Sequence, residues 1–195
     1  MTWLEHVNKW KDCTRCPLHQ QRDQIVLARG QVPCTVLFIG EAPGASENAL
    51  GTPFVGPAGH LLDQIIERAL PQITSYALTN LVACFPAEAK GRGDNEPQHS
   101  EIMQCQPRLV EFVRIAKPRL VVLVGSLAKE YVHGASQFRL DRQPKQPEWI
   151  PEDKRLEFCE VYHPAFILRM PLAQKQIAVQ KTIVVLRNAV QDVLE

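Results

Sequence analysis

Four short runs of apolar, mostly β-branched residues are spaced along the chain, and small or polar residues follow each run. They cover residues 35–39, 76–80, 120–124 and 158–162. Uninterrupted apolar runs of this length are typical of strands that are buried on both faces of a parallel sheet. The pattern therefore predicts four parallel strands.

Between these runs, apolar residues recur every three or four positions, as expected for helices with one buried face. The spacing predicts helices over residues 3–12, 61–70, 102–113, 126–133 and 173–194, the third interrupted or kinked near Pro107. Strands that alternate with helices indicate an α/β fold with helices on both faces of the sheet. Prolines, glycines and charges in residues 86–97 and 142–153 indicate loops.

Composition adds limits to this picture. The 195 residues are close to the length of one domain, so we expect a single domain over residues 1–195. Twenty-two Lys and Arg residues against 21 Asp and Glu leave a formal charge of +1, which excludes a uniformly basic nucleic-acid binder but not a local basic patch. No apolar run approaches the roughly 20 residues of a membrane span, and the first residues lack a signal-like stretch. We expect a soluble, cytoplasmic protein.

The six cysteines fall into two groups. Cys34 and Cys159 lie within apolar runs and are expected in the core, where a free thiol packs as a small apolar group. Cys13 and Cys16 form a CxxC motif, whose two thiolates can face one metal. Four thiolates suit either a structural zinc ion or a [4Fe–4S] cluster, and their spacing leaves both open. The four candidates are Cys13, Cys16, Cys84 and Cys105.

Chemistry-bearing side chains follow three of the predicted strands. Glu41 comes directly after the first strand, Asn80 ends the second, and His163 follows the fourth. The glycines of residues 40–59 match neither GxGxxG nor the P-loop, which argues against nucleotide binding. Instead, this segment offers the carboxylates of Glu41 and Glu47 and the ring of Phe54.

Each of these residues alone also suits an ordinary turn, a packed ring or a surface histidine. The carboxyl ends of parallel strands, however, meet at one edge of the sheet, where ligands bind. An amide there can read the edge of a base, and a histidine can donate to a developing anion. One pocket formed by Glu41, Phe54, Asn80 and His163 explains all four together.

The same residues resemble the family 4 uracil-DNA glycosylases, the iron–sulfur branch of the uracil-DNA glycosylase superfamily. The resemblance rests on the four cysteines in the family's order and on four motifs: GEAPG at 40–44, GTPFVGPAG at 51–59, Thr79-Asn80, and His163-Pro164-Ala165 with Leu168-Arg169. It implies a three-layer αβα sandwich around a four-stranded parallel sheet. It also implies a [4Fe–4S] cluster, not zinc, on Cys13, Cys16, Cys84 and Cys105.

By this resemblance, the chain is a monofunctional glycosylase that excises uracil from single- and double-stranded DNA and so starts base-excision repair. It needs no magnesium or nucleotide, and we expect a monomer. The uracil leaves the base stack before reaction. Phe54 then stacks on its ring and Asn80 reads its edge, while His163 stabilises the departing base and Glu41 holds the attacking water.

The resemblance assigns further residues to the substrate. Ala42 and Glu47 are expected beside the uracil, with Glu47 near the attacking water and C5, where it disfavours the methyl group of thymine. Leu168 and Arg169 match the segment that fills the gap left by the extruded base, and an apolar wedge beside a cation suits that task.

The chain departs from the family before the fourth cysteine. Family members carry a Gly-Asn-Arg-x-Pro segment there, whereas this chain has GDNEP at 93–97. Asp94 thus stands where the family's asparagine positions water, although a shift of one residue places Asn95 there. Lys90 and Arg92 of the same loop suit either DNA phosphates or solvent. His99 lies on the wrong side of Pro97 to match a relative that captures the sugar covalently through a histidine.

Three alternatives remain at the level of sequence. The altered loop is compatible with a uracil-DNA binder that retains its product, through Asp94 as a carboxylate nucleophile. A glycosylase for another deaminated or modified base fits the same pocket. An iron–sulfur electron carrier fits least, because it has no use for Phe54, Asn80 and His163.

Overall fold

The sheet of the protein is larger than the sequence pattern predicts. A computed structural model describes residues 1–86, 96–133 and 156–195. Within these ranges the sheet has five strands in the order β1-β3-β2-β4-β5. Strands β2 to β5 are parallel, and β1 pairs antiparallel with β3 at the edge. The strands are β1 (Ala28–Gly30), β2 (Val36–Gly40), β3 (Tyr76–Asn80), β4 (Leu120–Val124) and β5 (Glu157–Val161).

The α/β class and the four parallel strands are thus confirmed, and the strand number of four is corrected to five. Strand β1 spans only three residues, and none of them is buried. Because this segment is so short and is not buried, it contains no apolar run that would predict a strand.

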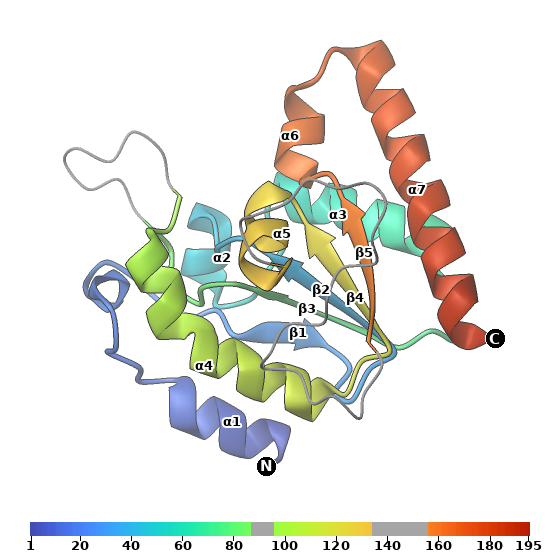
Figure 1. Cartoon of the computed structure of the whole chain (residues 1–195). Helices are drawn as coiled ribbons and strands as arrows, with labels where there is room; N and C mark the ends of the chain where they lie inside the picture. Colours follow the sequence, from blue (N-terminus) through green and yellow to red (C-terminus); the bar gives the residue numbers. More distant parts are fainter. Residues whose placement is uncertain (87–95, 134–155) are drawn as a thin grey trace.

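Helices cover both faces of the sheet, which gives the expected three layers (Figure 1). Helices α3 and α7 pack on one face, whereas α4 and α5 pack on the other, with α1 outside α4. Short α2 and α6 lie near the carboxyl ends of the strands. The bounds are α1 (Trp3–Trp10), α2 (Ala45–Leu50), α3 (Pro57–Ala69), α4 (His99–Ala116), α5 (Ser126–His133), α6 (Pro164–Arg169) and α7 (Leu172–Leu194), with a 3₁₀ turn η1 (Pro17–Gln20).

Alternate residues of the strands supply two separate cores. Val36 and Phe38 of β2 face α3 and α7, while Leu37 and Ile39 face α4 and α5. All four side chains are fully buried, which explains why β2 is apolar at every position. Cys34 and Cys159 are buried, as predicted for core thiols.

Two details of the helices differ from the prediction. Helix α4 continues through Pro107 without interruption. Proline has no N–H to donate to the carbonyl one turn earlier in the helix. Pro107 is exposed, so that carbonyl lies on the side of the helix that faces solvent. Helices α2 and α6 have six residues each and were not predicted, because so few residues show no helical period. No helix in the described ranges is long and apolar enough to cross a membrane.

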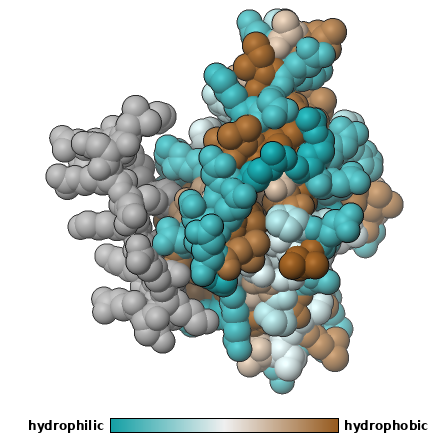
Figure 2. Space-filling model, turned by 90° about the vertical axis from the view of Figure 1, so that its right-hand side faces the viewer, coloured by the Kyte–Doolittle hydropathy of each residue, from teal (hydrophilic) through white to brown (hydrophobic). Residues whose placement is uncertain are grey.

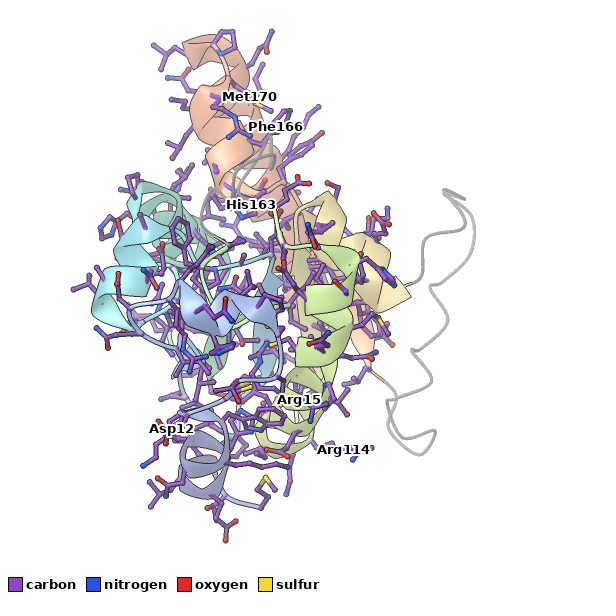
Figure 3. All side chains as sticks on the ribbon, turned by 90° about the vertical axis from the view of Figure 1, so that its left-hand side faces the viewer. Asp12, Arg15, Arg114, His163, Phe166 and Met170 are labelled. Atoms are coloured by element: carbon purple, nitrogen blue, oxygen red, sulfur yellow. The ribbon has the colours of Figure 1, made fainter. Side chains whose placement is uncertain are left out.

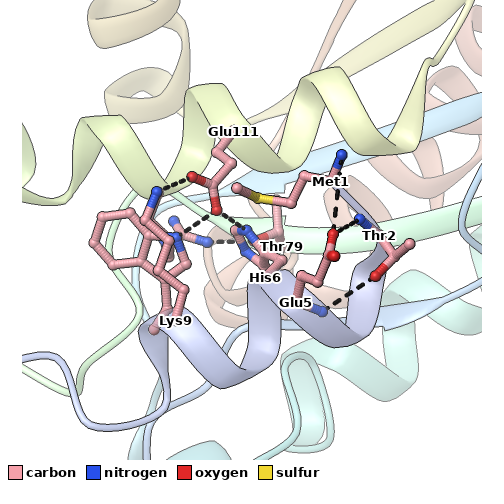
Figure 4. A network of polar contacts seen from close by, with 9 residues as sticks. Met1, Thr2, Glu5, His6, Lys9, Thr79 and Glu111 are labelled. Atoms are coloured by element: carbon pink, nitrogen blue, oxygen red, sulfur yellow. Dashed lines mark hydrogen bonds and ion pairs between the residues drawn. The ribbon is translucent and has the colours of Figure 1, made fainter.

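Helix α1 is fixed to α4 through one carboxylate (Figure 4). Nδ1 of the fully buried His6 lies 2.7 Å from Oε1 of Glu111, and Nε1 of Trp10 donates to the same oxygen at 2.7 Å. Lys9 pairs with the other oxygen of Glu111. Because α1 leads directly into Cys13 and Cys16, this contact determines where that segment begins relative to α4.

Candidate active site

Four strand ends form a continuous row across the sheet. Gly40 of β2 pairs with Asn80 of β3, and Val124 of β4 pairs with Val161 of β5. The row extends past the strands, because the Leu81 amide donates to the carbonyl of Gly40 at 2.9 Å. The residues predicted to form one pocket therefore start from one edge of the sheet.

Asn80 and Phe54 come together at the α-carbon of Gly40. A Cβ added to Gly40 would lie 2.5 Å from Oδ1 of Asn80 and 2.5 Å from Cζ of Phe54. Both side chains are almost fully buried, at 3% and 7% exposure. Glycine at position 40 thus allows an amide and an aromatic ring to approach the same point of the backbone. The expected convergence of Phe54 and Asn80 is present.

The backbone of Phe54 is in a strained conformation and is held there. Its φ of 57° lies in the left-handed region, which side-chain-bearing residues seldom adopt. Arg29 of β1 donates from Nε to the carbonyl of Pro53 at 2.8 Å and from Nη2 to that of Phe54 at 3.2 Å. Its Nη2 also pairs with Asp63 of α3 at 2.5 Å. Sequence reasoning missed Arg29, because it missed the strand that carries it.

Glu47 acts on the same loop through its carboxylate. Oε1 accepts hydrogen bonds from the amides of Val55 at 2.8 Å and Gly56 at 2.7 Å, and Oε2 accepts from Gly44 at 3.0 Å. The side chain is buried. These contacts hold the segment that follows Phe54 against the start of α2. The expected place of Glu47 beside uracil stays a prediction.

His163 has a defined protonation state at the end of β5. Nδ1 accepts the amide hydrogen of Ala165 at 3.2 Å, and the ring packs on Gly125, where an added Cβ would meet the Cβ of His163 at 3.0 Å. Burial lowers the pKa of His163, and the nearby Arg169 lowers it further. A neutral ring whose Nδ1 is an acceptor carries its proton on Nε2. His163 can therefore donate from Nε2 without being charged.

Glu41 lies just past the end of β2, where the backbone is still paired: the Val82 amide donates to its carbonyl at 3.3 Å. Burial raises the pKa of Glu41 to about 7, and the carboxylate of Glu96 adds to the effect. Such a group takes up or releases a proton near neutral pH, as suits a general base. Ala42 follows it and is half-buried against the core beneath α4.

A buried arginine on α4 holds the end of β3. Nη1 of Arg108 donates to Oγ1 of Thr79 at 3.0 Å, and Nη2 donates to the carbonyls of Asn80 and of Leu81, the latter at 3.0 Å. Arg108 is 1% exposed. Three hydrogen bonds from a rigid guanidinium fix the backbone that presents the Asn80 amide. No sequence motif marked Arg108.

The four candidate cluster cysteines come from three separate segments that meet beside the amino-terminal half of α4. Cys13 and Cys16 lie between α1 and η1, Cys84 follows β3, and Cys105 lies on α4. Burial raises the pKa of Cys16 to about 11, and the nearby Cys84 and Cys105 contribute. Nη1 of Arg22 donates to Sγ of Cys84 at 3.3 Å and to the Cys13 carbonyl at 2.6 Å.

The thiols are close enough to influence one another and are not paired in disulfides. Nevertheless, across residues 1–86, 96–133 and 156–195 no three His, Cys, Asp or Glu side chains are arranged to hold a metal ion. The four cysteines thus form one neighbourhood, and the metal site expected on them stays a prediction.

The remaining predicted residues are placed as follows. Leu168 and Arg169 are exposed on α6, one turn beyond His163. Outside the described residues lie Lys90, Arg92, Asp94 and Asn95. His99 begins α4, and its Nδ1 lies 2.8 Å from the hydroxyl of Tyr131 on α5.

A separate cleft of about 870 Å³ lies at the opposite end of the sheet. Its lining includes Thr2, Pro33, Arg114 and Lys117, and none of the predicted site residues.

Comparison with known proteins agrees with this geometry. Residues 28–187 match the model of the uracil DNA glycosylase superfamily. A type-4 uracil-DNA glycosylase of Pyrobaculum aerophilum is 33% identical over 165 residues, which cover 83% of this chain and 82% of that protein. A type-4 uracil-DNA glycosylase of Sulfurisphaera tokodaii is 32% identical over 84% of this chain and 74% of its own length. One from Thermotoga maritima is 28% identical over 82% and 79%.

Proposed function

The chain belongs to the uracil-DNA glycosylase superfamily, and from this membership we propose that it hydrolyses the N-glycosidic bond between uracil and deoxyribose in DNA. The observation that carries the proposal is the meeting of Phe54 and Asn80 over Gly40, on the sheet edge that also bears the neutral His163. An aromatic face, an amide and a hydrogen-bond donor are the groups that bind a flat, polar base and stabilise it as it leaves.

Recognition follows from the chemistry of the amide. The target must first leave the duplex, because its glycosidic bond is unreachable inside the stack. Phe54 stacks on the extruded ring, and the Asn80 amide accepts from N3–H of uracil and donates to O4. Cytosine presents the opposite groups at both positions. Each buried group left without a partner costs about 1–3 kcal/mol, which disfavours cytosine.

Bond cleavage uses the two titratable groups at the strand ends. As the bond stretches, negative charge gathers on uracil O2 and positive charge on the sugar. His163 donates from Nε2 to O2, and a neutral donor is sufficient because the stabilisation comes from a fixed dipole in a dry site. Glu41 as a carboxylate orients the attacking water and favours the cationic sugar. The bond between C1′ and N1 breaks and uracil leaves as an anion, while water bonds to C1′ and gives up its proton to Glu41.

The resemblance to the family 4 glycosylases favours a [4Fe–4S] cluster over a zinc ion on the four cysteines. A cluster gives each of its four thiolates a separate iron and spreads them apart, whereas zinc gathers all four around one ion. The four thiols influence one another's pKa, which supports a shared site on these residues. Cys13, Cys16, Cys84 and Cys105 would hold the cluster, and Arg22 donates to the sulfur of Cys84. These residues would thereby be joined across three segments of the chain.

The proposal places the protein at the start of base-excision repair, because its product is an abasic site. We further propose that the protein acts on both single- and double-stranded DNA, and that it is a monomer in the cytoplasm. A balanced formal charge indicates a small basic footprint on DNA, with few phosphate contacts.

The test is a panel of oligonucleotides that differ in one base. We expect the protein to release free uracil, detected by mass spectrometry, and neither cytosine nor thymine. Asn80→Ala should lower uracil release at least about 100-fold, because it removes both contacts to the base edge. Release of a different modified base in place of uracil would contradict the proposal.

A further inference from the structure

Two aromatic rings are exposed beside the active site. Tyr162 is 52% exposed and Phe166 is 48% exposed, although large aromatic side chains are usually buried. Their centroids lie 6.0 Å apart, with 39° between the ring planes, so the two rings form one surface.

This aromatic pair is continuous with the strand-end site. Tyr162 directly precedes His163, and the amide of Phe166 donates to the carbonyl of His163 at 2.9 Å. Figure 3 shows Phe166 on α6 just beyond His163, with Met170 farther out. Both rings therefore lie on residues next to His163, the proposed donor to the departing base.

The surroundings of the pair suit a nucleic acid. Leu168 and Arg169 are exposed on the same short helix, and Arg169 is close enough to lower the pKa of His163. The projecting end formed by α6 and the start of α7 carries apolar side chains among polar ones (Figure 2). Aromatic rings beside a cation are the combination that binds single-stranded DNA, through stacking and phosphate contact.

We propose that Tyr162 and Phe166 form a stacking platform for the nucleobase next to the extruded uracil. The inference rests on the proposed function and extends it to one neighbouring nucleotide. When uracil leaves the stack, its neighbour loses a stacking partner, and the platform replaces that partner. In single-stranded DNA the neighbour is unstacked from the start, so the platform contributes more to single-stranded than to double-stranded substrates.

The experiment is a double-mutant cycle between protein and DNA. One arm compares the wild type with Phe166→Ala, Tyr162→Ala and the conservative variants Phe166→Tyr and Tyr162→Phe. The other compares single-stranded DNA containing one uracil with the same DNA lacking the base on its 5′ or 3′ side. Ile73→Ala is the control, because Ile73 is 93% exposed in the turn before β3, away from the strand ends.

We expect Phe166→Ala to raise KM on intact single-stranded DNA about tenfold, within the range measured for base–aromatic stacking. The conservative variants and Ile73→Ala should stay near the wild type. On DNA lacking the neighbouring base on the contacted side, the wild type should bind as weakly as Phe166→Ala, and the substitution should have no further effect.

An equal loss for Phe166→Ala on all DNAs would overturn the platform, because no particular neighbour would then be contacted. The platform would also be overturned if both alanine variants bound DNA as tightly as the wild type. A loss of self-association as the only effect of the substitutions would overturn it too, because the two rings would then form a contact between two copies of the chain. The same DNAs are also titrated by fluorescence anisotropy. If the wild type releases no uracil, the proposed function fails, while the binding cycle still tests the platform.

Discussion

Gly40 shows how a residue without a side chain can control a binding site. Its α-carbon is the point against which both the Asn80 amide and the Phe54 ring pack. In the sequence, this glycine looks like an ordinary turn residue after a strand. Its role appears only when the packing of two residues from other segments is known.

Gly40→Ala should therefore reduce activity and also lower stability by about 1–3 kcal/mol. The new methyl group would lie 2.5 Å from atoms of both side chains, and both must move. Displacements of this size cost about 100-fold in rate when they misplace a bound substrate. Single-turnover excision and thermal unfolding measure the two effects. An unchanged rate would show that Asn80 and Phe54 are not jointly positioned by Gly40.

Glu41 predicts a pH dependence of the rate. With a pKa of about 7, its ionised fraction rises from about one tenth at pH 6 to about nine tenths at pH 8. The single-turnover rate should rise about tenfold over this interval. The pKa of His163 is lowered, so this ring is not expected to gain charge as pH rises and adds no decline. Glu41→Gln should be slow and independent of pH; a wild-type pH profile in this variant would exclude Glu41 as the group.

The same carboxyl group also predicts a change in stability. Its folded pKa lies above the ordinary value of 4.5, so ionising Glu41 costs stability as pH rises from about 4.5 to about 7. Glu41→Gln removes this cost. The variant should thus melt at a higher temperature than the wild type at pH 8 and at the same temperature at pH 4. Scanning calorimetry at both values measures the difference.

Among the elements, helix α4 links the parts of the site. Cys105, Arg108 and Glu111 follow one another at intervals of three along the helix. They belong respectively to the cysteine neighbourhood, to the backbone around Asn80 and to the anchor of α1. Positions three apart share one helix face, so the three contacts are made by the same side of α4.

Arg108→Met should weaken both folding and recognition. It leaves the carbonyls of Asn80 and Leu81 without their donor, and the free energy of unfolding should fall by about 3 kcal/mol. Because Asn80 is no longer fixed, KM for uracil-DNA should rise more than kcat falls. Arg108→Lys should restore part of the loss, and Arg114→Met, exposed on the same helix, should behave as the wild type. If Arg108→Met and Arg114→Met had equal effects, Arg108 would not be the residue that holds the backbone around Asn80.

The sequence predicted the parallel strands and the long helices because their buried faces leave regular apolar patterns. It did not predict β1, α2 or α6, which are too short to show a period. Nor did it reveal Arg29 or Arg108, because both bond to backbone carbonyls far along the chain. Every residue has a backbone carbonyl, so no residue type in the sequence marks these partners.

For the whole molecule, the proposed cluster would join the amino-terminal segment, the segment that follows β3, and α4, which carry the four cysteines. Replacing one of the four should remove the cluster: Cys105→Ser should lose the iron, the sulfide and the visible absorption of the purified protein. Cys159→Ala, in the core between β5 and the helices, is the matched control and should keep all three. Retention of the cluster by Cys105→Ser would exclude Cys105 as a ligand.

The central claim is catalytic turnover on uracil-DNA, and one measurement tests it most directly. Purified protein is incubated with an excess of end-labelled single-stranded DNA containing one uracil. Half of each sample is treated with hot alkali, and half is run on a denaturing protein gel. We predict alkali-dependent cleavage far beyond one event per protein and no shifted band. A band that survives denaturation and stops at one per protein would contradict the account and point to covalent capture by the chain.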